Sequence, residues 1–176
     1  YSGFNGSVSA IALQFDGKIL VGGDFINYKN NTVNRIVRLN GDGSIDDTFI
    51  SGTGFSSAVS CIVIQSDGKI LVGGSFSTYQ GVNSSKLIRL NTDGTIDTSL
   101  NVGTGFNGSV NTIALQSDNK IIVGGTFTTY KGPQNNRIIR LNTDGVRDVT
   151  FGSVSNFGFD NAVNSIVIRS NNKIIV

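Results

Sequence analysis

The chain has 176 residues, a formal net charge of +2 and only 15% charged residues, so it lacks the clustered Lys and Arg of a nucleic-acid-binding protein. Glu, Met, His and Trp are absent, whereas Gly occurs 23 times and Asn 20 times, and this scarcity of strong helix formers excludes a mainly helical fold. No apolar run approaches the roughly 18 residues of a membrane span, and the N-terminal YSGFNGS has neither an initiator Met nor a signal-peptide core, which predicts a soluble piece of a longer protein.

The first predicted strand runs from Val8 to Gln14, where apolar and polar residues alternate, and the second covers 18–23. Between them stands Asp16-Gly17. Both residue types tolerate the positive φ that a two-residue type I′ turn requires at its two positions. The pair of strands is therefore expected to form a tight hairpin.

A connection of about eleven residues, 24–34, separates the second strand from a third strand at 35–39. The turn NGDG, residues 40–43, then leads into a fourth and weaker strand at 44–49. Gly at the end of this turn suits the left-handed position of a longer hairpin loop. Four short antiparallel strands are thus predicted in the first part of the chain.

The same order of elements recurs along the whole sequence. DGKILVGG at 16–23 returns at 67–74 and, as DNKIIVGG, at 118–125. A truncated copy, NNKIIV, ends the chain, and successive copies of the Lys are 51, 51 and 53 residues apart. One unit is therefore about 51 residues, and the chain holds roughly three and a half units.

Four antiparallel strands in a unit of this length are typical of a β-propeller blade. We predict an all-β chain in which residues 1–176 form part of one propeller domain, with blades at about 8–50, 59–101 and 110–152 and a half blade at 163–176. Fewer than four blades cannot close a ring. The expected partners are therefore the remainder of its own propeller, which is favoured, or neighbouring subunits.

The repeat also resembles a known family. V-x-x-I-A-L-Q-x-D-G-K-I-L-V-G-G-x-F followed by R-I-x-R-L-N-x-D-G-x-I-D is similar to the delta-60 repeat, a bacterial and phage-associated propeller repeat distantly like the NHL repeat. The departures are small: Asn119 and Asn172 replace Gly, Leu100 replaces Phe, and Arg147 replaces Ile. The resemblance covers essentially the whole chain. It implies a propeller in a secreted or surface-exposed setting and supplies no catalytic residues.

Catalytic residues are not expected in these 176 residues. His and Glu are absent, and the candidate acids Asp46, Asp97 and Asp148 recur once per unit, whereas a catalytic pair would be unique. The pattern NxDGxxD also resembles half of a calcium loop. However, Arg38 and its equivalents stand where upstream Asp ligands belong. We therefore predict turns and an Arg–Asp pairing, with no metal and no cofactor.

Two further features have structural interpretations. Cys61 shares its repeat position with Ala10, Thr112 and Ser165, so it is expected to be a small buried residue. The pairs Gly22-Gly23 and their equivalents follow a strand but open no helix, which argues against a phosphate-binding loop. They are expected to mark a bulge or a close approach of the backbone.

The long connections are the expected binding surface, because loops on a rigid scaffold are where recognition usually lies. They should emerge at the end opposite the tight turns. Their recurring Phe and Tyr are expected to be structural, and the positions that vary between units are the predicted contacts: Lys29, Asn31, Gln80, Asn83, Lys131 and Gln134. Their neutral, amide-rich character suits a protein or glycan surface.

The sequence predicts a non-enzymatic structural and binding module of a larger extracellular, cell-surface or virion-associated protein. The alternative is the propeller of a hydrolase or lyase whose catalytic residues lie outside this chain. A unique, non-recurring cluster of acids would separate the two.

Overall fold

The computed structural model describes residues 3–152 and 157–176. The regular elements within these ranges are all β-strands. No helix in the described residues is long and apolar enough to cross a membrane. Nine strands form three sheets of three, namely β1 (Val8–Leu13), β2 (Ile19–Gly23) and β5 (Ile36–Leu39); β6 (Val59–Ile64), β7 (Ile70–Gly74) and β10 (Leu87–Leu90); and β11 (Val110–Leu115), β12 (Ile121–Gly125) and β13 (Ile138–Leu141). The shorter pairs are β3 (Asn27–Tyr28) with β4 (Asn31–Thr32), β8 (Thr78–Tyr79) with β9 (Val82–Asn83), and β14 (Val167–Ile168) with β15 (Ile174–Ile175).

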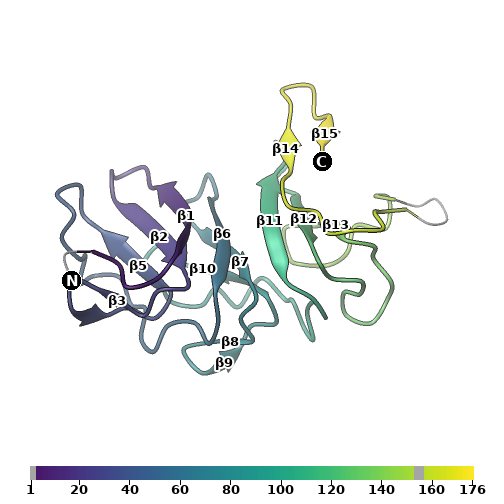
Figure 1. Ribbon diagram of the computed structural model, residues 1–176. Coiled ribbons are helices and arrows are strands. Elements are labelled where there is room, and N and C mark those ends of the chain that lie inside the picture. The colour runs from purple at the N-terminus through teal and green to yellow at the C-terminus, as the bar shows by residue number, and fades with distance from the viewer. Residues whose placement is uncertain (1–2, 153–156) are drawn as a thin grey trace.

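Each three-stranded sheet is antiparallel throughout, with its second strand in the middle. The sheets stand side by side along the chain, and β14–β15 follow beside β11 (Figure 1). The first strand of one sheet contacts the first strand of the next, β1 with β6 and β6 with β11. This is the radial order of propeller blades, as predicted, and each sheet with its loops is called a blade below.

The hairpin turn between β1 and β2 differs from the prediction. Gln14 N–H donates to Lys18 O at 2.8 Å and Gly17 N–H donates to Gln14 O at 3.0 Å, which encloses a type I turn followed by Gly17 with φ of 82°. Only Gly17 of this turn has positive φ, so the two-residue type I′ turn was the wrong assignment. The Asp16 carboxylate accepts the Lys18 N–H at 3.1 Å, which holds Asp16 in the ordinary conformation of a turn.

The predicted fourth strand is reduced to a single β-bridge, Leu39 with Ile45, in the first blade. The chain turns immediately afterwards, because the Asp46 carboxylate accepts the Thr48 N–H at 3.1 Å and Phe49 N–H donates to Asp46 O at 3.1 Å. An Asp that bonds the backbone two residues on competes with a strand. Each blade therefore has three full strands and one bridged residue.

The long connections are not free loops. In the first blade, β3 and β4 form a hairpin in which Lys29 and Asn30 have φ of 45° and 67°. Positive φ at both central residues defines the type I′ turn. The second blade repeats it, with φ of 50° at Gln80 and 78° at Gly81. The turn type expected between the first two strands thus occurs in the connections instead.

The glycine pairs lie where blades meet. A Cβ on Gly22 would be 2.5 Å from Val59 Cγ1 and 2.9 Å from Ile62 Cδ1 of the next blade. A Cβ on Gly23 would be 2.0 Å from Ser7 O, beside a bulge in β1 between Val8 and Ala10. Both expectations for the pair, a bulge and a close approach, are confirmed. Adjacent blades therefore pack through Val and Ile side chains laid on glycine backbone.

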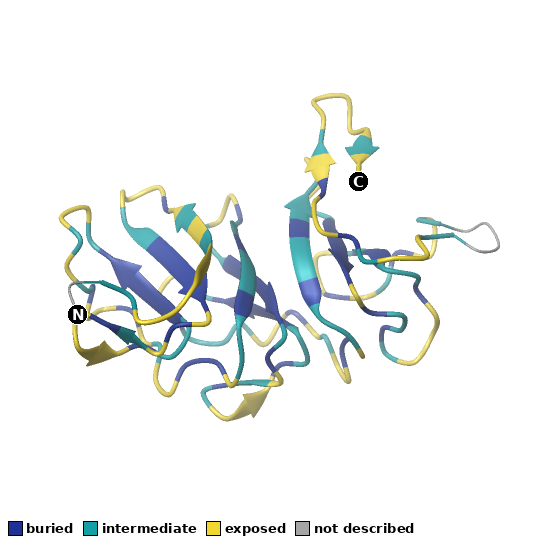
Figure 2. Ribbon diagram, viewed as in Figure 1, coloured by how far each residue is buried: buried dark blue, intermediate teal, exposed yellow. Residues whose placement is uncertain are grey.

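The first blade leaves this packing surface uncovered. Ile11, Leu13 and Phe15 are 69%, 68% and 80% exposed, whereas Ile62, the equivalent of Ile11 in the second blade, is 9% exposed. Figure 2 shows the same contrast as exposed positions along β1 and buried or half-buried ones along β6. The recurring Phe25, by comparison, is fully buried.

Candidate functional site

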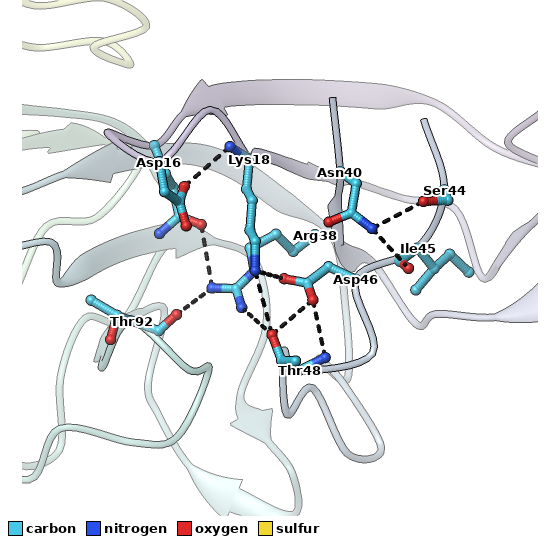
Figure 3. A network of polar contacts seen from close by, with 10 residues as sticks. Asp16, Lys18, Arg38, Asn40, Ser44, Ile45, Asp46, Thr48 and Thr92 are labelled. Carbon is cyan, nitrogen blue, oxygen red and sulfur yellow. Dashed lines mark hydrogen bonds and ion pairs between the residues drawn. The ribbon is translucent and has the colours of Figure 1, made fainter. Parts of the chain in front are cut away.

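A polar network occupies the side of the first blade that faces the second (Figure 3). Arg38 Nε donates to Asp46 Oδ2 at 2.6 Å, and Lys18 Nζ lies 2.8 Å from the same oxygen. Arg38 Nη2 donates to Thr48 Oγ1 at 3.1 Å, and Arg38 Nη1 donates to the main-chain carbonyl of Thr92 in the next blade. The Arg38 and Asp46 side chains are 6% and 5% exposed. The predicted pairing of the Arg and Asp positions is confirmed.

The network recurs in the other two blades. Arg89 Nε donates to Asp97 at 2.7 Å and Arg89 Nη1 donates to Thr143 O of the third blade at 2.8 Å. Arg140 likewise donates to Asp148 at 2.9 Å. In the first and second blades the guanidinium therefore fastens a turn of the following blade. The sequence alone gave no signal for this contact, because its acceptor is a backbone carbonyl on another repeat.

These contacts keep the three aspartates ionised. Burial by itself raises the pKa of Asp46, but hydrogen bonds from Lys18, Thr48 and Arg38 outweigh it and hold the pKa well below 3.8. Asp97 is held down in the same way by Ser99, Lys69 and Arg89 against burial. A carboxylate fixed by several donors cannot take up a proton near neutral pH, so this network suits joining blades rather than acid–base chemistry.

The calcium-like turns are also satisfied internally. Asp42 Oδ1 accepts from the Ser44 N–H at 2.9 Å and from its hydroxyl at 2.7 Å. In residues 3–152 and 157–176, no group of three or more His, Cys, Asp or Glu side chains could hold a metal ion. Cys61 is half-buried rather than fully buried as expected; it packs against the core that contains Val110 and Ile113 of the next blade, and burial raises the pKa of its thiol to about 12.

The recurring tyrosines are anchors, as expected. Tyr28, Tyr79 and Tyr130 are buried, and Tyr28 Oη donates to Gly43 O at 2.8 Å. Because Gly43 belongs to the turn after β5, the connection folds back along the outer edge of the sheet. The connections are therefore folded hairpins tied to the blade by their tyrosines, a feature that the sequence analysis did not predict.

The six predicted contact residues lie on these folded-back hairpins. Lys29, Asn31, Asn83 and Gln134 are exposed, and Gln80 and Lys131 are half-buried. Gln80 Nε2 donates to Ile50 O and Lys131 Nζ donates to Asn101 O, both at 2.6 Å. These two side chains thus also hold the segment arriving from the preceding blade.

The six residues do not converge on one pocket. Asn31 borders a hollow of 270 Å³ in the first blade, and Gln134 borders another of 160 Å³ in the third. Each hairpin contributes its own exposed amides and amines to the outer edge of its blade. Such an arrangement can contact an extended surface, but it does not enclose a small molecule as a single cavity does.

Three stretches of the chain, residues 14–49, 65–100 and 116–151, match a family described as a domain of unknown function (DUF5122) beta-propeller. A comparison with curated proteins found no match. Among solved structures, the chain is similar to the extracellular domain of a one-component system from B. thetaiotaomicron, with 16% identity and a TM-score of 0.56, over 96% of this chain and 19% of that chain.

The chain is also similar to virginiamycin B lyase from Staphylococcus aureus, solved as a catalytically inactive variant with quinupristin. The identity is 21% and the TM-score 0.52, over 99% of this chain and 50% of that chain. The chain thus spans about a fifth of the length of the first protein and about half of the length of the second. The likeness to them shows a shared fold. Together with the repeating blades, the three matched stretches show that the chain belongs to the DUF5122 beta-propeller family.

Proposed function

We propose that the chain is a non-enzymatic structural and binding module of an extracellular or cell-surface protein, and that its hairpins contact a glycan or protein surface. The observation that carries the proposal is that a hairpin combines a buried anchoring side chain with an exposed side chain that varies between blades. Tyr79 is fully buried and bonded to Gly94 O at 2.9 Å, whereas Asn83 in the same hairpin is exposed. The invariant tyrosines fix the hairpin, and four of the six varying residues are exposed, as a recognition surface requires: Lys29, Asn31, Asn83 and Gln134.

Rigidity supports this role. The type I′ turns and the tyrosine anchors hold the hairpins in one conformation, so little conformational entropy is lost when a partner binds. The side chains offer amide and ammonium groups close to aromatic rings, and the Lys29 ammonium lies 5.2 Å from the centroid of the Tyr28 ring. Hydrogen bonding with ring contacts is the chemistry of polar protein and glycan surfaces.

The extracellular setting is supported by the fold shared with the extracellular domain of the B. thetaiotaomicron protein. The exposed Ile11 and Leu13 support a second element of the proposal. Further blades of the same repeat, from the rest of the protein or from a neighbouring subunit, would cover this face as the glycine backbone of the first blade covers Ile62.

The experiment is to replace the six predicted residues together by Ala or Ser in the full protein and to probe an array of oligosaccharides. We expect the parent protein to bind and the variant to lose at least tenfold in affinity. The matched control changes Asp16, Asp67 and Asp118 to Asn in the first turn of each blade, because Asn retains the turn hydrogen bond. Equal binding by parent and six-residue variant would contradict the proposal.

A catalytic role is the second candidate, because virginiamycin B lyase shares the fold. The aspartates distinguish the two. If the protein is a binding module, changing Asp46, Asp97 or Asp148 to Asn will weaken folding to a similar extent at each position. Loss of an activity of the full protein on changing only one of them, with folding intact, would favour the enzyme.

A further inference from the structure

The third blade carries a polar hollow that the repeat does not explain. It measures 160 Å³ and is lined by Gln134, Asn135, Asn136, Ile138, Ile139, Arg147, Phe151, Gly152 and Phe157. It lies between the hairpin connection and the segment after β13. A volume below the roughly 300 Å³ of an ordinary small-molecule pocket suits one ring or one end group of a longer ligand.

Arg147 is the first sign of a specific ligand. Its equivalents Ile45 and Ile96 are apolar and pack against the cores of their blades. Arg147 is half-buried in the same place, and its guanidinium makes no hydrogen bond or ion pair with any residue of the described ranges. A guanidinium kept beside Ile139 and Phe151 offers its planar donors to an anion, and a carboxylate matches them bidentately.

The amides beside it add acceptors. Gln134 Nε2 donates to Asn136 Oδ1 at 3.0 Å and Asn135 Nδ2 donates to Pro133 O at 2.8 Å. Each bond uses one of the two amide hydrogens, and the side-chain oxygens of Gln134 and Asn135 remain as acceptors for hydroxyl groups of a ligand. Asn135 is only 6% exposed and its amide is bonded to Pro133 O, so its side chain is held in place beside the hollow.

The first blade supplies the comparison. Its hollow of 270 Å³ has Val33, Val37 and Ile45 at the positions of Asn135, Ile139 and Arg147. Position 147 is thus polar only in the third blade, whereas the equivalent of Asn135 is Val33 in the first blade and Ser84 in the second, and both Asn135 and Arg147 line the same hollow. Phe151 and Phe157, with ring centroids 5.0 Å apart, form its aromatic wall.

We propose that this hollow binds the terminal uronic acid of an acidic glycan. Arg147 receives the carboxylate, the oxygens of Gln134 and Asn135 accept ring hydroxyls, and the phenyl rings contact the C–H face of the sugar. The inference rests on the glycan-binding form of the proposed function. It adds to that function an acidic substrate class and one blade as the site.

The test uses isothermal titration of the full protein with D-galacturonic acid, D-galactose and acetate. We expect D-galacturonic acid to bind at least tenfold more tightly than either of the others, since only it presents both the carboxylate and the hydroxyls. Arg147→Ile restores the residue of the other blades, so folding should persist while this binding falls at least tenfold. Arg169→Ile, the same change in the exposed turn between β14 and β15, is the matched control.

Each outcome tests one part of the proposal. Unchanged galacturonate affinity in Arg147→Ile would show that Arg147 does not bind the carboxylate and would overturn the site. Acetate binding as tight as galacturonate would show that the sugar ring makes no contribution and would overturn the assignment of a uronic acid. Asn135→Val, which copies Val33, should weaken galacturonate several-fold and leave acetate unaffected. A variant changed at the other five hairpin residues but retaining Gln134 should still bind galacturonate, so that failure of the hairpin surface is distinguishable from failure of this site.

Discussion

Arg89 Nη1 in the second blade donates a 2.8 Å hydrogen bond to the main-chain oxygen of Thr143 in the third. The same guanidinium holds Asp97 within its own blade at 2.7 Å. One side chain thus stabilises both its own blade and the contact with the next blade. Because the guanidinium is 7% exposed, solvent screens these interactions little.

Replacing Arg89 by Met should lower the free energy of unfolding by about 3 kcal/mol, since the buried Asp97 carboxylate keeps only Lys69 and Ser99 as donors and the Thr143 carbonyl loses the guanidinium. Urea unfolding of the full protein measures this. Arg140→Met is the comparison: Arg140 is 18% exposed and donates to no main-chain carbonyl in the ranges described. Arg140→Met should lower the free energy of unfolding by less than Arg89→Met does. An equal decrease would mean that the contact between blades contributes nothing to stability.

Stability should fall in acid because of the same network. The pKa values of Asp46, Asp97 and Asp148 are depressed in the folded protein, so the unfolded chain takes up protons at a pH where the folded protein does not. Their contribution is complete above about pH 5 and is lost progressively as the pH falls below 4. Urea unfolding at pH 7, 4, 3 and 2 should show this decline. Asp97→Asn should be less stable at pH 7 and decline less steeply, and an unchanged slope would contradict the assignment.

The close contacts at the glycine pairs predict which substitutions weaken the packing between blades. Gly22→Ala should cost about 1–3 kcal/mol, because its Cβ would lie 2.5 Å from Val59 Cγ1 and force the next blade outward. Val59→Ala in the same chain should recover part of the loss. Gly41→Ala is the control, since a Cβ there meets nothing within 4 Å. Thermal unfolding compares the three, and equal shifts at Gly22 and Gly41 would disprove the close-packing argument.

The repeat and the strand order could be predicted because alternation and turn residues are local signals. The turn types were exchanged: Asp16-Gly17 is compatible with several turns, and its side-chain bond to the Lys18 N–H decides among them. The fourth strand was overestimated for the same reason, since the turn at Asp46 depends on where its carboxylate bonds.

Within the candidate sites, the Arg–Asp pairing followed from two positions that recur together. Its acceptor across the blade contact did not, because any residue type can supply a carbonyl. The departure of Arg147 from Ile was visible in the sequence. Its significance appears only when Gln134 and Asn135 are seen to line the same hollow.

The exposed first strand gives the last prediction. Ile11 and Leu13 are 69% and 68% exposed on the face that, in the second blade, lies against the glycine backbone of the first, and Phe15, directly after β1, is 80% exposed. An apolar patch of this kind promotes association, so the 176-residue chain should self-associate as its concentration rises. Changing all three to Ser should shift light-scattering masses toward the monomer, whereas Val149→Ser, at a single side chain that is 73% exposed, should not. If the triple variant associates as strongly as the parent, another surface is responsible, and β1 is not where a further blade docks.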